Sequence, residues 1–233
     1  MRSETVLNYN PIPFDHTYIL YDPNDILSII CVHFSLLPIY IMVFYTSWFL
    51  ITREIEPVII VGGHLANELA NKIVKVILKQ PRPDFHKAFG ETSYSLSFGM
   101  PSAHSQFIGF FAAYFISTII YQVPTLKNYQ KGIGCIMLAL ALVCVSASRT
   151  YLLYHTIEQV LVGCLLGYVL GMAYFIVAAI VREIGLVDWI LNVGIVRYFC
   201  IKDSYYWCYQ TFEDELNHCN KLVHIQRSKQ RGQ

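Results

Sequence analysis

Charged residues are scarce in this chain of 233 residues. Asp, Glu, Lys and Arg make up 14% of the sequence, whereas 55% is hydrophobic. Soluble globular domains usually carry about 25% charged residues, so the deficit favours one membrane-embedded bundle over one or two soluble domains. The formal net charge of +1 gives no basis for nucleic-acid binding.

Other features are missing as well. The seven cysteines are odd in number and form no CxxC motif, which argues against a disulfide framework and a zinc site. The polar N-terminal segment has no apolar run after Arg2, so we expect no cleavable signal peptide. The first hydrophobic helix is then the expected insertion signal.

Long apolar segments are what the chain does contain. A spanning helix needs about 20 mainly apolar residues, and five segments meet or approach this length: residues 26–51, 57–78, 105–123, 132–148 and 155–181. In the last of these, Gly163, Gly167 and Gly171 form a small-xxx-small stripe suited to close helix packing. We predict an all-α, polytopic membrane helix bundle of five spans.

The C-terminal part divides differently. Residues 184–199 are apolar but carry Asp188, Asn192 and Arg197, which favours an interfacial helix and leaves a sixth span open. The predicted domains are a lumenal N-terminal segment (1–25), a membrane domain (26–200) and a cytoplasmic tail (201–233). The tail is expected to form a surface helix followed by a disordered end.

The second apolar segment has a polar side. His64, Asn67, Glu68, Asn71, Lys72 and Lys75 recur at steps of three and four residues, so they are expected on one side of a helix. A charge at mid-bilayer costs at least about 2.5 kcal/mol, so we expect this side to face the bundle interior or a wet cavity. Glu68 and Lys72 are also spaced to form a purely structural ion pair.

Three polar strings lie at the edges of these segments. They are KVILKQPRP (75–83), PSAH (101–104) and SRTYLLYH (148–155). With five spans, the 79–104 connection and the connection after Arg149 fall on the same side of the membrane. The strings are therefore expected to converge on one face.

Lysine and arginine counts predict which face this is. The face of the strings has five such residues: Arg2, Lys79, Arg82, Lys87 and Arg149. The opposite face has ten: Arg53, Lys127, Lys131, Arg182, Arg197, Lys202, Lys221, Arg227, Lys229 and Arg231. The second face should lie in the cytoplasm, and the strings should face the lumen or exterior.

The residue types in the strings suit phosphate chemistry. Lys75, Arg82 and Arg149 supply three positive charges for phosphate oxygens, and arginine's planar fork matches two such oxygens at once. Ser102 and the backbone N–H groups of the helix that follows can donate hydrogen bonds. Pro101 is expected in the first turn of that helix.

A nucleophile and a proton donor are also needed. The expected site face has no aspartate cluster able to hold Mg²⁺, which argues against a two-metal mechanism. Histidine can take either role near neutral pH. His104 and His155 are the two histidines within the strings, and the residues alone leave open which of them attacks.

The strings resemble the tripartite signature of the type 2 phosphatidic acid phosphatase superfamily: KxxxxxxRP, PSxH and SRxxxxxH. The matching positions are Lys75, Arg82, Pro83, Pro101, Ser102, His104, Ser148, Arg149 and His155. The resemblance implies that His155 attacks phosphorus to form a phosphohistidine and that His104 protonates the leaving group. It also implies that Lys75, Arg82, Ser102 and Arg149 bind the phosphate, without a metal or other cofactor.

One position departs from the superfamily pattern. The third string commonly continues to an aspartate that orients the histidine, but this chain has Gln159 there. The amide oxygen of Gln159 can still accept the imidazole N–H. The neighbouring Glu158 is the alternative, one position away in the helix.

Within the superfamily, the strings are most similar to those of eukaryotic dolichyl-diphosphatases, which share the glutamine. This resemblance implies a multi-pass enzyme of the endoplasmic reticulum membrane with a lumenal site. Its expected partners are the membrane and a polyprenyl (dolichyl) diphosphate, cleaved to the monophosphate for reuse in protein N-glycosylation. A broader lipid phosphate phosphatase and a non-catalytic membrane scaffold remain the alternatives, and the oligomeric state stays open.

Overall fold

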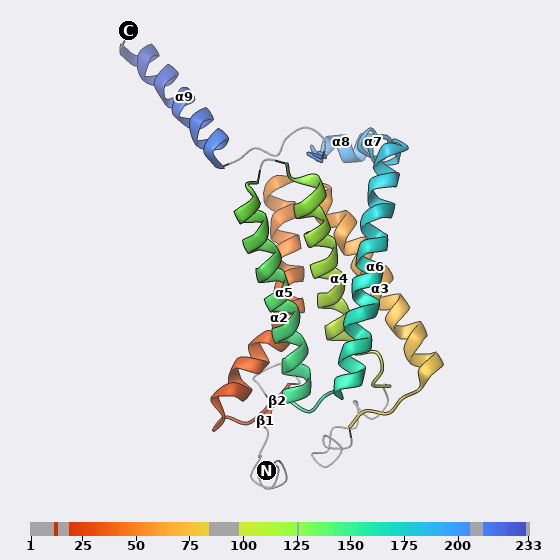
Figure 1. The fold of residues 1–233 in the computed structure, drawn as a ribbon. Helices are drawn as coiled ribbons and strands as arrows, with labels where there is room; N and C mark the ends of the chain where they lie inside the picture. The colour runs from red at the N-terminus through yellow and green to blue at the C-terminus, as the bar shows by residue number, and fades with distance from the viewer. Residues whose placement is uncertain (1–11, 14–18, 84–97, 125, 206–211, 232–233) are drawn as a thin grey trace.

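A computed structural model describes residues 12–13, 19–83, 98–124, 126–205 and 212–231. Long helices run side by side in Figure 1. They are α2 (Ile26–Thr52), α3 (Glu56–Leu78), α4 (Ala103–Ser117), α5 (Asn128–Tyr151) and α6 (Ile157–Glu183), with a π-helical continuation of α4, η3 (Thr118–Gln122). The two short strands, β1 (Ile12–Pro13) and β2 (Leu20–Tyr21), pair antiparallel beside the lower end of α2. The predicted all-α membrane bundle is confirmed.

Local sequence signals account for the ends of the helices. The Asp25 carboxylate caps α2 by accepting from the N–H of Leu27 (3.0 Å). Thr156 and Gln159 form a capping box at the start of α6. Gly185, at a φ of 77°, lies just beyond the end of α6 and separates it from the next short helix. α2 continues through Pro38 without a break.

The expected segments agree with the observed helices to within a few residues at each end, and two of the differences have a clear local cause. The fourth was predicted over 132–148, but α5 begins at Asn128, because the side-chain oxygen of Gln130 accepts from the N–H of Lys127 (2.9 Å) outside the apolar run. The fifth was predicted to begin at His155, but α6 begins at Ile157 and His155 lies in the preceding turn.

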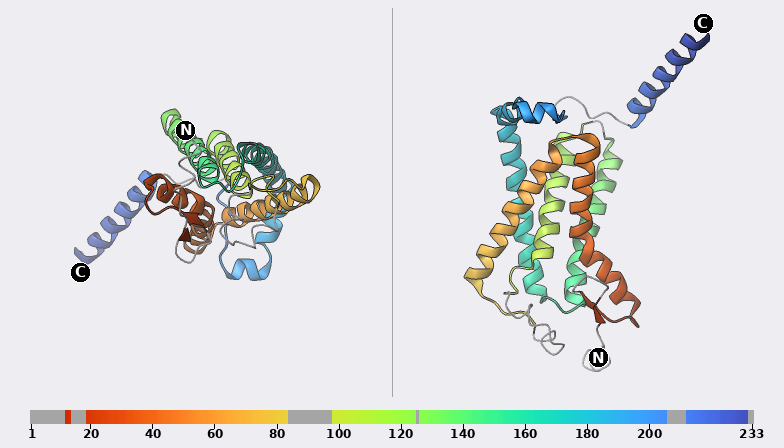
Figure 2. Two further views of the ribbon diagram at one scale, coloured as in Figure 1. Left: turned by 90° about the horizontal axis from the view of Figure 1, so that it is seen from below. Right: turned by 180° about the vertical axis from the view of Figure 1, so that it is seen from behind.

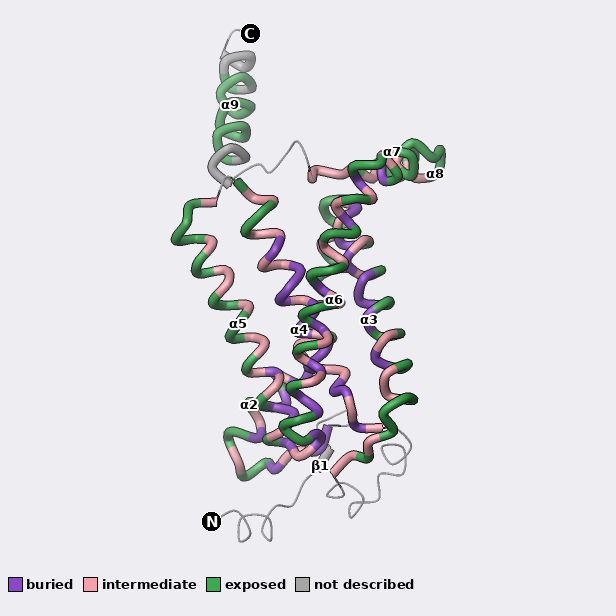
Figure 3. The backbone as a smooth tube through the Cα atoms, turned by 45° about the vertical axis from the view of Figure 1, so that its right-hand side comes forward, coloured by how far each residue is buried: buried purple, intermediate pink, exposed green. Residues whose placement is uncertain are grey.

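Four of the helices, α2, α4 with η3, α5 and α6, are long and apolar enough to cross a membrane. Large hydrophobic side chains point outward from them, and Phe44, Ile136 and Leu165 are 56%, 61% and 66% exposed. Figure 3 shows these outer faces in green. An apolar surface of this extent is suited to lipid. α3 runs beside the four helices but is more polar, because its second half carries Glu68, Lys72 and Lys75.

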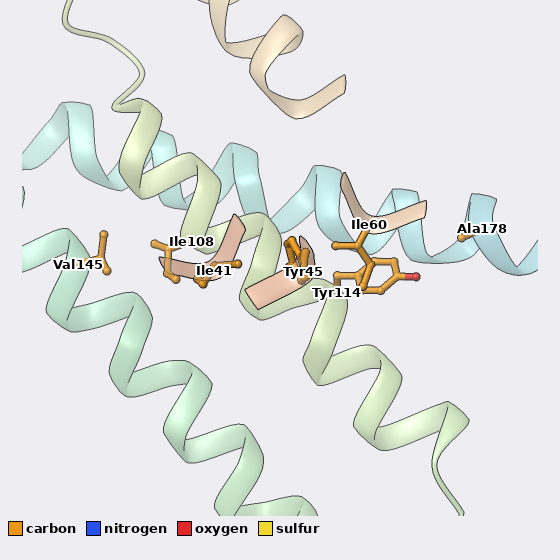
Figure 4. Packing of buried hydrophobic residues seen from close by; sticks show 7 residues of the cluster. All are labelled: Ile41, Tyr45, Ile60, Ile108, Tyr114, Val145 and Ala178. Atoms are coloured by element: carbon orange, nitrogen blue, oxygen red, sulfur yellow. The ribbon is translucent and has the colours of Figure 1, made fainter. Parts of the chain in front are cut away.

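α4 is the central helix, and its buried face supplies much of the core. One cluster joins residues of all five long helices, as Figure 4 shows: Ile41, Tyr45, Ile60, Ile108, Tyr114, Val145 and Ala178. Four of them, Ile60, Ile108, Tyr114 and Val145, have no measurable exposure. The core therefore fixes the helices around α4 near the middle of the bundle.

α4 and α6 make the most extensive helix contact, along the predicted glycine stripe. A Cβ atom at Gly163 would lie 2.7 Å from the carbonyl oxygen of Ser102. At Gly167 it would lie 2.1 Å from that of Gln106, so no side chain fits there. The stripe brings the start of α6 against the start of α4, where the second and third polar strings lie.

The C-terminal segment begins at the end of the bundle farthest from the strings. Two short helices, α7 (Leu186–Leu191) and α8 (Gly194–Tyr198), lie across this end, so residues 184–199 form no sixth span. Arg182 of α6, with its side chain 1% exposed, pairs with Glu56 of α3 and with Asp203 (2.9 Å). The tail continues into α9 (Phe212–Arg231), which points away from the bundle in Figure 2.

Candidate active site

The three polar strings meet at the end of the bundle where β1 and β2 lie (Figure 1). Lys75 is in the last turn of α3, and Arg82 follows in the connection to α4. Ser102 caps α4 and His104 lies in its first turn, while Arg149 is in the last turn of α5. His155 occupies the turn between α5 and α6. The predicted convergence on one face is therefore what the fold produces.

The turn after α5 places His155 two residues before the start of α6. The N–H groups of Tyr154 and His155 both donate to the carbonyl oxygen of Arg149, at 3.1 and 3.2 Å. Leu153 adopts a left-handed backbone, with φ at 61°. The turn thereby reverses the chain within a few residues, and the His155 side chain is only 4% exposed.

Gln159 determines which nitrogen of His155 carries the proton. The Nε2 of Gln159 donates to the carbonyl oxygen of Pro81 (2.9 Å), which can only accept, so the amide oxygen must face the other way. That oxygen lies 3.1 Å from Nδ1 of His155. Assigned from this network, Nδ1 carries the hydrogen and Nε2 keeps a lone pair.

Burial and nearby cations keep His155 neutral. Burial is the largest cause, followed by the charges of Arg149 and Arg82, and together they lower the pKa of His155 to about 3. The hydrogen bond to Gln159 and the charge of Lys75 are smaller influences. An imidazole that is neutral at pH 7, with a free Nε2, is equipped to act as a nucleophile.

His104 belongs to the same electrostatic cluster. The charges of Arg149, Arg82 and Lys75 act on it, as does His155. The two histidines come from the start of α4 and the turn before α6, which the backbone joins directly: the N–H of Ser102 donates to the carbonyl oxygen of Gln159 (3.0 Å).

Arg149 is held rigidly although it is almost fully buried, at 2% exposed. Its guanidinium carbon lies 4.3 Å from the centre of the Tyr154 ring, a cation–π arrangement. Its Nη1 donates to the hydroxyl of Ser35 (3.2 Å), which is also 3.1 Å from the hydroxyl of Ser148. These contacts fix the plane of the guanidinium, which favours two-point binding of an anion.

The N-terminus of α4 adds hydrogen-bond donors. α4 begins at Ala103 with Ser102 as its N-cap residue. The N–H groups of residues 103–105 precede the first hydrogen bond of the helix, from the N–H of Gln106 to the carbonyl of Ser102 (2.9 Å). An anion is favoured at such a helix start. The buried hydroxyl of Ser102 accepts from Ser105 (3.1 Å).

Comparisons with known proteins agree with this arrangement. The sequence pattern described as the PAP2 superfamily matches residues 56–182, which contain all three strings. The chain belongs to this superfamily. A dolichyldiphosphatase of Saccharomyces cerevisiae is 47% identical over 199 residues, covering 85% of this chain and 83% of the yeast protein. Dolichyldiphosphatase 1 of Homo sapiens is 31% identical over 171 residues, covering 70% of each chain.

A solved structure is also similar to this PAP2 chain. It is a transmembrane PAP2 type phosphatidylglycerolphosphate phosphatase from Bacillus subtilis, 22% identical with a TM-score of 0.49. The similarity covers 66% of this chain and 75% of the bacterial one.

Several residues at the PAP2 site were not found from the sequence. Gln106 of α4 links α3 to the second string: its Nε2 donates to the Oδ1 of Asn67 (2.9 Å), and its Oε1 accepts from Asn71 (2.6 Å). Ser35 of α2 and Tyr154 hold Arg149. The only sequence signal for Gln106 and Ser35 is a polar residue within an apolar run.

Two expectations about the site were wrong in detail. Pro101 was expected in the first turn of α4, but it precedes the N-cap, and its peptide bond with Met100 is cis. Glu158 was the alternative partner for His155, but it is exposed, and the buried Gln159 makes the contact. Helical geometry explains this outcome, because adjacent residues point about 100° apart.

The polar side of α3 is also divided. His64, Asn67 and Asn71 are buried, as expected, and Lys75 is half-buried. Glu68 and Lys72 are exposed instead, with side chains 51% and 70% exposed, although they form the expected ion pair at 3.9 Å. They lie one position round the helix from the buried stripe, on its outer flank.

Proposed function

We propose that this PAP2 chain is a membrane hydrolase that cleaves dolichyl diphosphate to dolichyl phosphate and inorganic phosphate. Its relatives in yeast and human carry the name of this activity. The observation that carries the proposal is the neutral His155, oriented by Gln159 and surrounded by the cations Lys75, Arg82 and Arg149. This arrangement suits attack on a phosphorus atom that bears negatively charged oxygens.

In the first step, Lys75, Arg82, Arg149 and the Ser102 end of α4 bind the terminal phosphate. Nε2 of His155 attacks phosphorus, and the bond to the bridging oxygen breaks. His104 donates its proton to that oxygen, so dolichyl phosphate leaves and a phosphohistidine remains. Pro83, Pro101 and Ser148 support the loops and helix ends that carry these groups.

In the second step, water attacks the phosphohistidine. His104, now deprotonated, accepts a proton from this water, and inorganic phosphate forms as the bond to Nε2 breaks. The three cations neutralise the phosphate oxygens throughout, so the mechanism requires no metal. The Gln159 oxygen keeps Nδ1 protonated in both steps, which holds Nε2 toward phosphorus.

The proposed location is the endoplasmic reticulum membrane, with the site facing the lumen. The flank with ten lysines and arginines includes Arg53, Arg182 and Lys202, which lie together at the end opposite the site. The positive-inside rule assigns that end to the cytoplasm. An N-glycosylation acceptor added before residue 12 should then be glycosylated, and one added after residue 231 should not. The reverse pattern would contradict this orientation.

Phosphate release from dolichyl diphosphate by the purified protein tests the activity. His155→Ala should abolish release, whereas His218→Ala, a matched change on the exposed face of α9, should leave it unchanged. EDTA should not inhibit the wild-type protein. Full turnover by His155→Ala would refute the mechanism, and equal hydrolysis of phosphatidate would favour a broader lipid phosphate phosphatase.

A further inference from the structure

We infer that the isoprenoid tail of the substrate lies in a groove between α3 and α6 at the depth of the membrane. This inference rests on the function proposed above, because it assigns a place to the apolar part of the same substrate. The diphosphate binds at the end of the bundle. The tail must therefore run from this end into the membrane along one side of α4.

The groove has a volume of about 200 Å³. Its walls come from three helices and include Gly63, Ala66 and Asn67 of α3, Phe110 of α4, and Ala173 and Tyr174 of α6. The Tyr174 hydroxyl donates to the carbonyl oxygen of Ile59 (2.7 Å), so the ring is the part left to form the wall. Apart from Asn67, the surface suits a branched hydrocarbon.

Small residues keep this groove open. Ala66 and Ala173 are exposed residues on facing helices. Figures 1 and 3 show α3 tilted away from α6 toward the site end, and the two helices make few contacts. A flexible chain from the membrane can therefore lie between them.

The α3–α4 and α4–α6 interfaces leave no room for an isoprenoid tail. Between α3 and α4, Asn71 donates to Gln106 (2.6 Å) and Gln106 donates to Asn67 (2.9 Å). This polar ladder fills the interface that an apolar tail would need. Between α4 and α6, the backbone contact at Gly167 leaves no space. Of the three interfaces among α3, α4 and α6, the one between α3 and α6 is left for the tail.

The position of the groove implies selection for long chains. Gly63 and Asn67 precede Lys75 by 12 and 8 residues, which corresponds to about 12–18 Å along the helix axis. A geranyl diphosphate reaches at most the near end of the groove at Asn67, whereas a polyprenyl chain passes through the whole of it. Lipid tails are as apolar as the groove, so the gain comes from packing and is moderate.

Filling the groove provides the first test. Ala66→Leu with Ala173→Leu should raise KM for a long-chain polyprenyl diphosphate about fivefold or more, as loss of about 1 kcal/mol of packing predicts. KM for geranyl diphosphate should stay within twofold (roughly the change that about 0.4 kcal/mol produces). The control is Ala139→Leu, an exposed alanine on the outer face of α5. Equal effects on both substrates, or no effect on either, would overturn the assignment.

A photolabelling experiment locates the bound tail without requiring catalytic turnover. A polyprenyl diphosphate with a diazirine beyond its second isoprene unit is irradiated with the full-length His155→Ala protein in lipid nanodiscs. Labels should fall on α3 residues 63–67 and α6 residues 170–177, and unlabelled polyprenyl phosphate should remove them. Labels confined to α2 or α5 would overturn the inference. If the wild type hydrolyses neither substrate but this labelling occurs, the proposed function fails and the groove assignment stands.

Discussion

Replacing Gln159 by glutamate places a negative charge beside the proposed nucleophile. The Gln159 oxygen lies 3.1 Å from Nδ1 of His155 and 3.3 Å from the N–H of Thr156. Both of these groups can donate equally well to a carboxylate. On its other side the new carboxylate faces the carbonyl oxygen of Pro81, which Gln159 binds at 2.9 Å. The Nε2 of Gln159 also donates to the Oε1 of Gln80 (3.3 Å). The variant therefore loses two loop contacts and strengthens the contact to the imidazole.

The added charge should raise the pKa of His155. The wild-type value is about 3, and an opposite charge within hydrogen-bond distance moves a pKa by about one to three pH units. The variant value is therefore expected between about 4 and 6. Protonated imidazole has no lone pair on Nε2, so activity is lost as the pH falls through this value. In the wild type the same loss occurs only near pH 3.

The assay is the pH profile of kcat/KM, which reports ionisations of the free enzyme. Between pH 4 and 7 the Gln159→Glu variant should gain an acidic limb that the wild type lacks. Glu158→Gln is the matched control, because Glu158 is adjacent in sequence but exposed. A Gln159→Glu profile that coincides with the wild type, or an equal displacement in Glu158→Gln, would refute the role assigned to Gln159.

Three further substitutions test packing and charge. Gly167→Ala should lower the free energy of unfolding by about 1–3 kcal/mol, because the added Cβ overlaps a backbone carbonyl. The control is Gly132→Ala, whose Cβ meets nothing within 4 Å, and it should not lower the free energy of unfolding. Arg182→Met should cost about 3–5 kcal/mol, because it leaves the carboxylate of Glu56 without its buried partner. Arg149→Lys should lower kcat/KM about 100-fold through loss of the planar, stacked guanidinium.

Unfolding in detergent, followed by circular dichroism, measures the first two effects. Equal stability of the Gly167 and Gly132 variants would contradict the close contact of α4 and α6. Arg197→Met is the control for Arg182, since Arg197 lies in the exposed α8, and an equal loss there would argue against the buried ion pair. Phosphate release measures the Arg149 effect, and a fully active lysine variant would contradict two-point phosphate binding.

The helices could be predicted because long apolar runs have few alternatives in a membrane. The run from Ile26 gave α2 to within one residue, and Pro38 did not interrupt it. Helix ends that depend on polar side chains were harder to predict, as the start of α5 at Asn128 illustrates. The β1–β2 pair and the contact between Leu20 and Tyr154, whose hydroxyl accepts at 2.7 Å, depend on tertiary structure and had no local signal.

The grouping of the candidate site residues was predictable where these residues are close in sequence. Lys75 and Arg82, or Arg149 and His155, occur at spacings that one helix end and one turn bring together. The partners that hold these groups come from other helices. Ser35 lies more than a hundred residues from Arg149, and the burial of Asn71 beside Gln106 depends on how α3 meets α4. Periodicity alone could not separate this buried stripe from the exposed Glu68 and Lys72.

The backbone contact of α4 with α6 has a consequence for how the protein accommodates a large lipid. His104 and His155 are attached to the ends of two helices that cannot slide apart, because glycine leaves no slack between them. Lys75 belongs to α3, which packs less extensively on α4 and on α6 than these two helices pack on each other. A small movement of α3 would therefore shift the proposed phosphate contact of Lys75, while the spacing of the two imidazoles stays constant.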